Sequence, residues 1–191
     1  MTFARLRTAD WLAMVAALAL LMIMATDWYS TVEGNQARKI ENSTPGNAPG
    51  EAGQDLRDYK NQARIVAESQ ERNAWQEKGL IDRVILITLL AAIALAIASG
   101  FLRAAGKRFE PPLTPSSLAA IAAGVGALLL TYRIVQEPGI DSFSTIKAGA
   151  PLAVAALGIL TFAGSRGLKH EEDGEPFRPL PEPTPPEPAP E

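Results

Sequence analysis

The sequence predicts an all-α fold: a four-helix transmembrane bundle with an extracytoplasmic helical loop between the first two spans and a disordered, proline-rich tail. Although only 47% of the 191 residues are hydrophobic, the apolar residues are clustered into four segments. Each segment approaches or exceeds the roughly 18–20 residues that cross a hydrocarbon core. The segments are apolar all round, whereas a helix on the surface of a soluble protein keeps one polar face.

The boundaries of the expected elements follow from the apolar runs and from the loop signals between them. In chain order they are a first span at 8–29, a flexible outer linker at 30–53, an amphipathic outer helix at 54–78, a second span at 80–103, a short cytoplasmic loop at 104–113, a third span at 115–135, a short outer loop at 136–145, a fourth span at 146–165 and a disordered acidic tail at 166–191.

The first span begins like a secretory signal, because Arg5 and Arg7 precede an apolar core. That core is about 16 residues long, which exceeds the usual apolar region of a signal peptide. It is followed by "TDWYS" instead of a small-residue cleavage site. We therefore expect an uncleaved anchor, with a cleaved signal as the alternative.

The loop after the first span is expected to have two parts. The segment "STPGNAPGEAG" is rich in glycine and proline and has no apolar period, which indicates a linker. The segment 54–78 has apolar residues at helical spacing and no internal proline or glycine. Gly79 permits this helix to bend across the top of the bundle, and its narrow apolar stripe needs either the bundle or a second copy as a partner.

Later boundaries carry their own signals. Thr114 can cap the third span, and Pro115 occupies the first helical position, where the missing N–H costs nothing. The tail has eight prolines from Pro176 onward and should be disordered with polyproline II character. It is either simply solvated or a ligand for a cytoplasmic partner that recognises proline-rich or acidic segments.

Lys and Arg set the expected orientation. Basic clusters precede the first span, occupy the loop between the second and third spans, and follow the fourth span. Four crossings put all three clusters on one side, which is then the cytoplasm. The loop 30–79 also carries seven Lys and Arg, but eight Asp and Glu lie among them. We expect a multi-pass protein of the bacterial plasma membrane with both termini in the cytoplasm.

A cluster of three charges, Asp82, Arg133 and Asp27, is predicted at the outer rim. Arg133 lies 18 residues after Pro115, about 27 Å along the third span. Asp27 and Asp82 reach a similar level on their own spans. Arg133 can pair with either acid, snorkel alone to water, or contribute to a ligand or ion site. Arg83 is a rival partner for the same acids.

Aromatic residues are expected to anchor the bundle at the two membrane interfaces, where amphipathic rings concentrate. The five assigned to this role are Trp11, Trp28, Tyr29, Trp75 and Tyr132. Small residues one turn apart, such as Ala120 with Gly124 and Ala150 with Gly158, favour close helix packing, either within the chain or between copies.

The sequence has no recognisable motif for catalysis, metal binding or nucleic-acid binding. The chain has no cysteine and a single histidine, so thiolate sites are excluded and no metal or other cofactor is expected. The net charge of −3 gives no nucleic-acid footprint. The spans carry no ionisable residue at mid-membrane, which disfavours proton relays and substrate paths. No nucleophile elbow, phosphate loop or paired-carboxylate geometry occurs.

The segments "RLRTADWLAMVAALALLMIMATDWYS", "AWQEKGLIDRVILITLLAA", "LLLTYRIVQEPG" and "IKAGAPLAVAALGILTFAGS" resemble a group of uncharacterised bacterial four-span membrane proteins. The resemblance covers the spans but neither the outer helix nor the tail. It implies an architecture with no assigned activity, and it makes Asp82 a more general partner of Arg133 than Asp27, where members of the group commonly have proline.

These features predict a non-enzymatic accessory, scaffold or sensor subunit. Its expected partners are the lipid bilayer, a second copy or another membrane protein, and a cytoplasmic protein that binds the tail. The alternative is a small transporter or channel subunit that acts as an oligomer. A membrane enzyme using Asp82 and Arg133 at the outer rim is the least favoured hypothesis.

Overall fold

The computed structural model describes residues 3–45, 50–76, 79–107, 114–136 and 145–173. This part of the chain is mostly helical, as predicted, with six α-helices and a short 3-10 helix, η1, at Phe3–Arg5. It also contains a three-stranded sheet, so the purely all-α prediction is wrong in that respect. Residues 108–113 of the predicted loop 104–113 and residues 137–144 of the predicted loop 136–145 lie outside the described residues.

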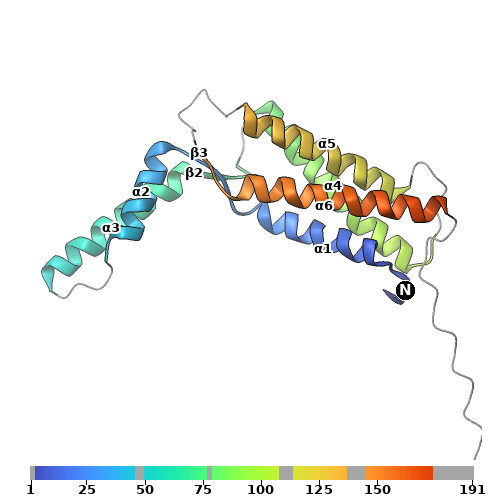
Figure 1. The fold of residues 1–191 in the computed structure, drawn as a ribbon. Coiled ribbons are helices and arrows are strands. Elements are labelled where there is room, and N and C mark those ends of the chain that lie inside the picture. The colour runs from blue at the N-terminus through green and yellow to red at the C-terminus, as the bar shows by residue number, and fades with distance from the viewer. Residues whose placement is uncertain (1–2, 46–49, 77–78, 108–113, 137–144, 174–191) are drawn as a thin grey trace, which may run out of the picture.

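Four helices lie side by side and form the bundle (Figure 1): α1 (Thr8–Ile23), α4 (Leu80–Ala104), α5 (Pro115–Val135) and α6 (Gly149–Glu172). Among the described residues, α4, α5 and α6 are long and apolar enough to cross a membrane. The α1 helix is apolar but has only 16 residues. The structure therefore supports three helices of spanning length where the sequence predicted four.

The bundle exposes many of its large aliphatic side chains, while its interior combines leucines with many alanines. Leu80 is 80% exposed and Leu128 is 73% exposed, whereas Ala17, Ala92 and Ala123 are fully buried. Water would penalise such a surface, because each exposed apolar square ångström costs about 25 cal/mol. Lipid instead covers it without penalty, and small residues let helices approach closely. The chain is thus a membrane-embedded protein.

Helix ends follow the local signals where these exist. Thr114 caps α5 by accepting a hydrogen bond from Ser117 N at 3.2 Å, and Ser117 Oγ accepts from Thr114 N at 3.0 Å. Pro115 is the first residue of α5, as predicted. The α6 helix continues to Glu172, so the predicted fourth span at 146–165 begins three residues early and ends too soon. The predicted tail from 174 onward lies outside the described residues.

Two helices, α2 (Val32–Ser43) and α3 (Glu51–Gln70), form a hairpin beyond the end of the bundle, here called the head (Figure 1). The predicted flexible linker at 30–53 is wrong, because α2 and the start of α3 occupy it. Thr31 Oγ1 caps α2 by accepting from Gly34 N at 2.9 Å. The predicted helix at 54–78 begins earlier and ends at Gln70. It packs on α2 and does not fold across the bundle.

The seam between α2 and α3 consists of very small residues. Ala37, Ala63 and Ala67 are at most 8% exposed. A Cβ added to Gly34 would lie 2.7 Å from Gln70 Cβ and 2.8 Å from Ser30 Oγ, so only glycine permits this approach. The predicted need of the outer helix for an apolar partner is therefore met in part by α2, a helix that the sequence did not predict.

The sheet joins the head to the bundle. Its central strand β1 (Asp27–Ser30) pairs antiparallel with β2 (Glu71–Asn73) and with β3 (Thr145–Ile146). The first span was predicted to end at 29, but α1 ends at Ile23 and the chain becomes extended at Asp27. Ser30 is opposite Glu71 on one side and opposite Thr145 on the other. Strands of two to four residues leave no alternating pattern to predict them.

Candidate functional site

The predicted pair between Asp82 and Arg133 forms. Arg133 Nε donates to Asp82 Oδ1 at 2.7 Å and its Nη2 donates to Oδ2 at 3.1 Å, a bidentate contact between the last turn of α5 and the first turn of α4. The Asp82 side chain is 6% exposed and that of Arg133 is 19% exposed. The rival, Arg83, is exposed. The pair fixes the rotation of two helices relative to each other at this end of the bundle.

A double-mutant cycle tests this pair. We expect Asp82→Asn and Arg133→Met to show a coupling energy of about 1–2 kcal/mol, because both partners of a charge-assisted bidentate contact are largely desolvated. The measurement is unfolding of the detergent-solubilised protein by SDS, followed by tryptophan fluorescence. A matched cycle on Asp82 and the exposed Arg83 should give coupling near zero. Equal coupling in the two cycles would contradict the assignment.

Asp27 does not join Arg133, so that part of the predicted cluster is wrong. Asp27 begins β1 and lies beside Glu71 of β2, which places it at the junction between head and bundle. The reason is the strand: the chain leaves the helical path after Ile23, and the helical rise used to estimate the level of Asp27 no longer applies. The three predicted charges thus divide between two sites.

A buried ionic site, the junction cluster, surrounds Glu71, whose side chain is 5% exposed. Its members are Glu71, Arg38, Lys147, Glu41 and Asp27. Lys147 Nζ lies 3.0 Å from Glu71 Oε1, and Arg38 Nε donates to the same oxygen at 3.2 Å. Arg38 Nη2 bonds the other Glu71 oxygen, and its Nη1 donates to Glu41 at 2.8 Å. These contacts connect α2, β2 and the segment between β3 and α6.

In the junction cluster, the pKa values of Glu71 and Asp27 are shifted in opposite directions. Burial disfavours the charge on Glu71, but hydrogen bonds and attraction from Arg38 and Lys147 outweigh it and hold the pKa of Glu71 below its usual value. For Asp27, burial and then the neighbouring Glu71 raise the pKa above its ordinary value of 3.8. The ionised Glu71 therefore stabilises the attachment of the head to the bundle, whereas an ionised Asp27 repels Glu71 and weakens this attachment.

Replacing Asp27 by asparagine is expected to raise the thermal stability modestly at pH 7. The folded-state pKa of Asp27 is raised, so its stabilising contribution is present below about pH 4 and is lost as the pH rises through the folded-state value. Asparagine removes the charge but can still hydrogen-bond Glu71. The gain should be small because Asp27 is exposed, and it should vanish as the pH approaches 4.

The measurement is the melting temperature of the two proteins in detergent between pH 4 and 8. Glu71→Gln serves as the opposite control, because a group with a lowered pKa contributes stability above its unfolded pKa. That variant should lose stability at pH 7. A lower melting temperature for Asp27→Asn at pH 7 would contradict the sign.

A second buried ionic site ties all four bundle helices together at the end opposite the head. This four-helix clasp consists of Arg103 of α4, Asp10 of α1, Ser116 of α5 and Glu171 of α6. Arg103 Nη2 donates to Glu171 Oε1 at 2.6 Å and to Ser116 Oγ at 2.9 Å, and Arg103 Nη1 bonds Asp10 Oδ1. The three charged side chains are only 3–4% exposed.

Neighbouring residues complete the clasp. Asp10 Oδ2 also accepts from Arg7 N at 2.9 Å at the start of α1, and Arg7 Nη1 lies 3.3 Å from His170 Nδ1. A Cβ at Gly167 would lie 3.0 Å from Arg103 Nη2, so glycine makes room for the guanidinium group. Among the described atoms, none accepts a hydrogen bond from Arg103 Nε. Arg103 of α4 thus contacts each of the other three helices of the bundle.

The clasp was not predicted from the sequence. Arg103 was expected only to set the topology near a loop, and Glu171 was expected in the disordered tail. One signal was available, because Asp10 and Glu171 each flank an apolar segment on the same predicted side of the membrane as Arg103. Their pairing could not be inferred, since it depends on the rotation of three helices.

Three of the predicted interface aromatics are exposed: Trp11 at 46%, Trp75 at 46% and Tyr132 at 54%. Trp28 and Tyr29 differ, being 2% and 4% exposed. Trp28 Nε1 donates to Ile23 O at 2.9 Å, and its ring covers Gly149, where a Cβ would lie 2.5 Å from Cδ1. These two aromatics therefore pack the joint between sheet and bundle, and the prediction that they anchor the interface is wrong.

Two small spaces lie within the bundle. One cavity of about 10 Å³ lies beside Asp82 under Trp28, and another of about 10 Å³ lies beside Asp10, each with room for about one water molecule. A shallow polar groove of about 500 Å³ runs along α2 and Thr145. Within the described residues, no three His, Cys, Asp or Glu side chains are placed to hold a metal ion. The ionic sites connect separate segments of the chain to one another.

Comparisons of the chain with protein-family models, with curated proteins and with solved structures found no match.

Proposed function

We propose that the chain is a four-span, non-enzymatic accessory, scaffold or sensor subunit of a bacterial plasma membrane that presents the head on the outer side. The observation that carries this proposal is the head itself. It is a helical hairpin beyond the end of an apolar bundle, and the buried Glu71 joins it to that bundle through Arg38 and Lys147. A partner that binds the head is therefore coupled mechanically to the membrane helices.

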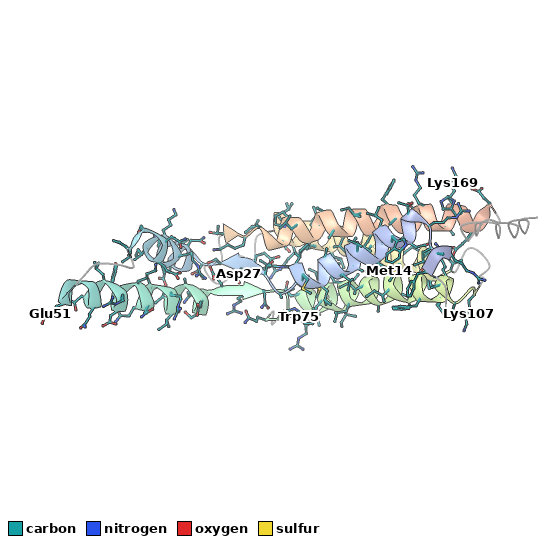
Figure 2. All side chains as sticks on the ribbon, turned by 90° about the horizontal axis from the view of Figure 1, so that it is seen from below. Met14, Asp27, Glu51, Trp75, Lys107 and Lys169 are labelled. Atoms are coloured by element: carbon teal, nitrogen blue, oxygen red, sulfur yellow. The ribbon has the colours of Figure 1, made fainter. Side chains whose placement is uncertain are left out.

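The distribution of basic residues supports an orientation with both termini in the cytoplasm. Lys107 and Lys169 lie at one end of the molecule, and Glu51 lies at the other (Figure 2). Arg5 and Arg7 precede α1 at the same end as Lys107 and Lys169, where the clasp brings the helix ends together. Positive charge marks the cytoplasmic side, so the head would face outward.

Cysteine accessibility tests this topology, because the chain has no native cysteine. Arg57→Cys in the head should react with an impermeant maleimide on intact cells. Lys107→Cys and Lys169→Cys should react only after the cells are opened. Lys107 is a better position than Gly106, whose φ of 76° would strain any residue with a side chain. Labelling of all three on intact cells would contradict the four-span arrangement.

A headless variant tests the function. Ser30 and Glu71 are paired neighbours in β1 and β2, so replacing residues 31–70 by Asn-Gly should close a two-residue hairpin and leave the bundle intact. We expect proteins that co-purify reproducibly with the full chain in mild detergent to be lost from the headless variant. Retention of the same proteins would contradict a contact role for the head.

Vesicles reconstituted with the purified full chain provide the test against the transporter alternative. The bundle interior is filled by alanine and leucine side chains, and its charged groups lie at the two ends. We therefore expect no ion flux above that of empty vesicles. Flux that persists without any partner would favour the transporter or channel subunit.

A further inference from the structure

The α3 helix has an exposed face that combines apolar and acidic residues. Tyr59 is 53% exposed, Ile65 is 61% exposed and Val66 is 44% exposed. Three exposed acids, Glu51, Asp55 and Asp58, lie on the same side toward the free tip of the head. At about 100° per residue, all six lie within about 60° of the direction of Gln62. We call these seven residues the acidic-apolar face.

The rest of α3 is arranged differently. Its basic residues Arg57, Lys60 and Arg64 lie within about 40° of the direction opposite Gln62. The seam with α2, formed by Ala63 and Ala67, lies to one side. The side opposite Gln62 is mainly basic, although Glu68 pairs there with Arg64 at 3.8 Å, whereas the acidic-apolar face carries acids and no base. The acidic-apolar face is not covered by α2.

Lipid around the bundle does not cover this face either. The head continues past the end of the bundle, with Glu51 at the point furthest from Lys107 (Figure 2). With 20 residues, α3 is about 30 Å long. Tyr59 and Val66 therefore lie well beyond the ends of the membrane-length helices, and the occupant of their face must come from the aqueous side.

A second copy is a poor occupant of the face. Copies in one membrane point their heads the same way, so a two-fold pairing of these faces would oppose Glu51, Asp55 and Asp58 with the same acids, which is repulsive. Docking of this face on the basic side of a neighbouring copy would balance the charges. However, that side offers no large apolar residue to Tyr59 and Val66.

We propose, on the basis of the contact role assigned to the head above, that the acidic-apolar face binds a protein surface in which an apolar patch is bordered by Lys or Arg. Tyr59 and Val66, two helical turns apart, are the apolar anchors, since they project from one side of α3. Asp55 and Asp58 select the charge of the partner and exclude acidic surfaces. Gln62 lies at the centre of the contact.

The test uses the full chain in nanodiscs and two labelled helical peptides with one identical leucine stripe, flanked by Lys in one peptide and by Glu in the other. Fluorescence anisotropy at about 150 mM salt measures binding. We expect the Lys peptide to bind at least about tenfold more tightly than the Glu peptide, a difference within the range of a few contact charges.

Variants separate the apolar and charged contributions. The double variant Tyr59→Ser, Val66→Ser should lower the affinity for the Lys peptide about tenfold. The double variant Asp55→Lys, Asp58→Lys should reverse the preference, so that the Glu peptide binds more tightly than the Lys peptide. Arg57→Ser with Arg64→Ser, on the opposite side of α3, is the matched control and should not weaken binding. All of these residues are exposed, and circular dichroism should show unchanged helix content.

Equal binding of both peptides, or no effect of the Tyr59 and Val66 changes, would overturn the proposal. So would a dimer in mass photometry that dissociates on Val66→Ser, because the face would then bind a second copy. If the headless variant loses its partners while the peptides fail to discriminate, the contact role stands and this partner chemistry is wrong. If the headless variant loses nothing, the contact role itself is wrong.

Discussion

Replacing Arg103 by methionine is expected to lower the free energy of unfolding by about 3–5 kcal/mol, because it leaves two buried carboxylates without a counter-charge. Asp10 and Glu171 have side chains only 4% exposed and face the guanidinium group from α1 and α6. Methionine retains the apolar stem but supplies no hydrogen-bond donor. The measurement is SDS-induced unfolding of the purified protein, followed by circular dichroism.

Two further proteins control this experiment. Lys107→Met changes an exposed cation three residues beyond the end of α4 and should alter stability by less than about 0.5 kcal/mol. The triple variant Arg103→Met, Asp10→Asn and Glu171→Gln should recover much of the loss, because the unpaired charges are gone. If Arg103→Met is as stable as Lys107→Met, the clasp contributes nothing to holding the four helices together.

Replacing Gly164 by alanine is expected to cost about 1–3 kcal/mol, the usual cost of overpacking an interior contact. A Cβ at this position of α6 would lie 2.8 Å from Ala120 Cβ and 2.9 Å from the carbonyl oxygen of Ser116. The neighbour is the backbone of α5, so no side chain can rotate away. The two helices must separate or shift, which should also disturb the hydrogen bond that Ser116 Oγ donates to Glu171 Oε2 at 3.0 Å in the clasp.

Gly158→Ala in the same helix is the matched control, since no atom lies within 4 Å of the added Cβ. The same substitution should there leave stability unchanged or raise it by up to about 1 kcal/mol through helix propensity. Both proteins are compared by SDS unfolding under one set of conditions. Equal stabilities of the two variants would show that α5 and α6 are not in close contact at Gly164.

Ala120 and Gly158 illustrate the limit of the small-residue pattern. Both belong to patterns that favour close packing, but in the structure only Ala120 lies in a close contact with another helix. Ala120 faces Gly164 across the seam between α5 and α6, while Gly158 faces open space. Spacing along one helix defines which residues share a face, but not which neighbour that face meets.

The head shows a similar division. Helical spacing in 54–70 correctly predicts most of α3, and the many charged residues beside its narrow apolar stripe indicate that it is not a span. The α2 helix was missed because its seam consists of Gly34 and Ala37, which leave little apolar signal in the sequence. The two helices of the head are held together by a close approach of their backbones at small residues. A search for apolar periodicity does not detect such a contact, because it depends on larger apolar side chains.

Features that depend on local composition follow from the sequence. The apolar segments, the cap at Thr114, the basic residues at one end and the similar level of Asp82 and Arg133 follow from residue type and from distance along a helix. The choice of Asp82 as the partner of Arg133, the junction cluster, the sheet and the clasp depend on the tertiary structure. Arg103 and Asp10 are 93 residues apart, and Arg38 and Glu71 are 33 residues apart. Such contacts depend on how helices rotate and how closely they approach, which small buried side chains control and residue spacing alone does not.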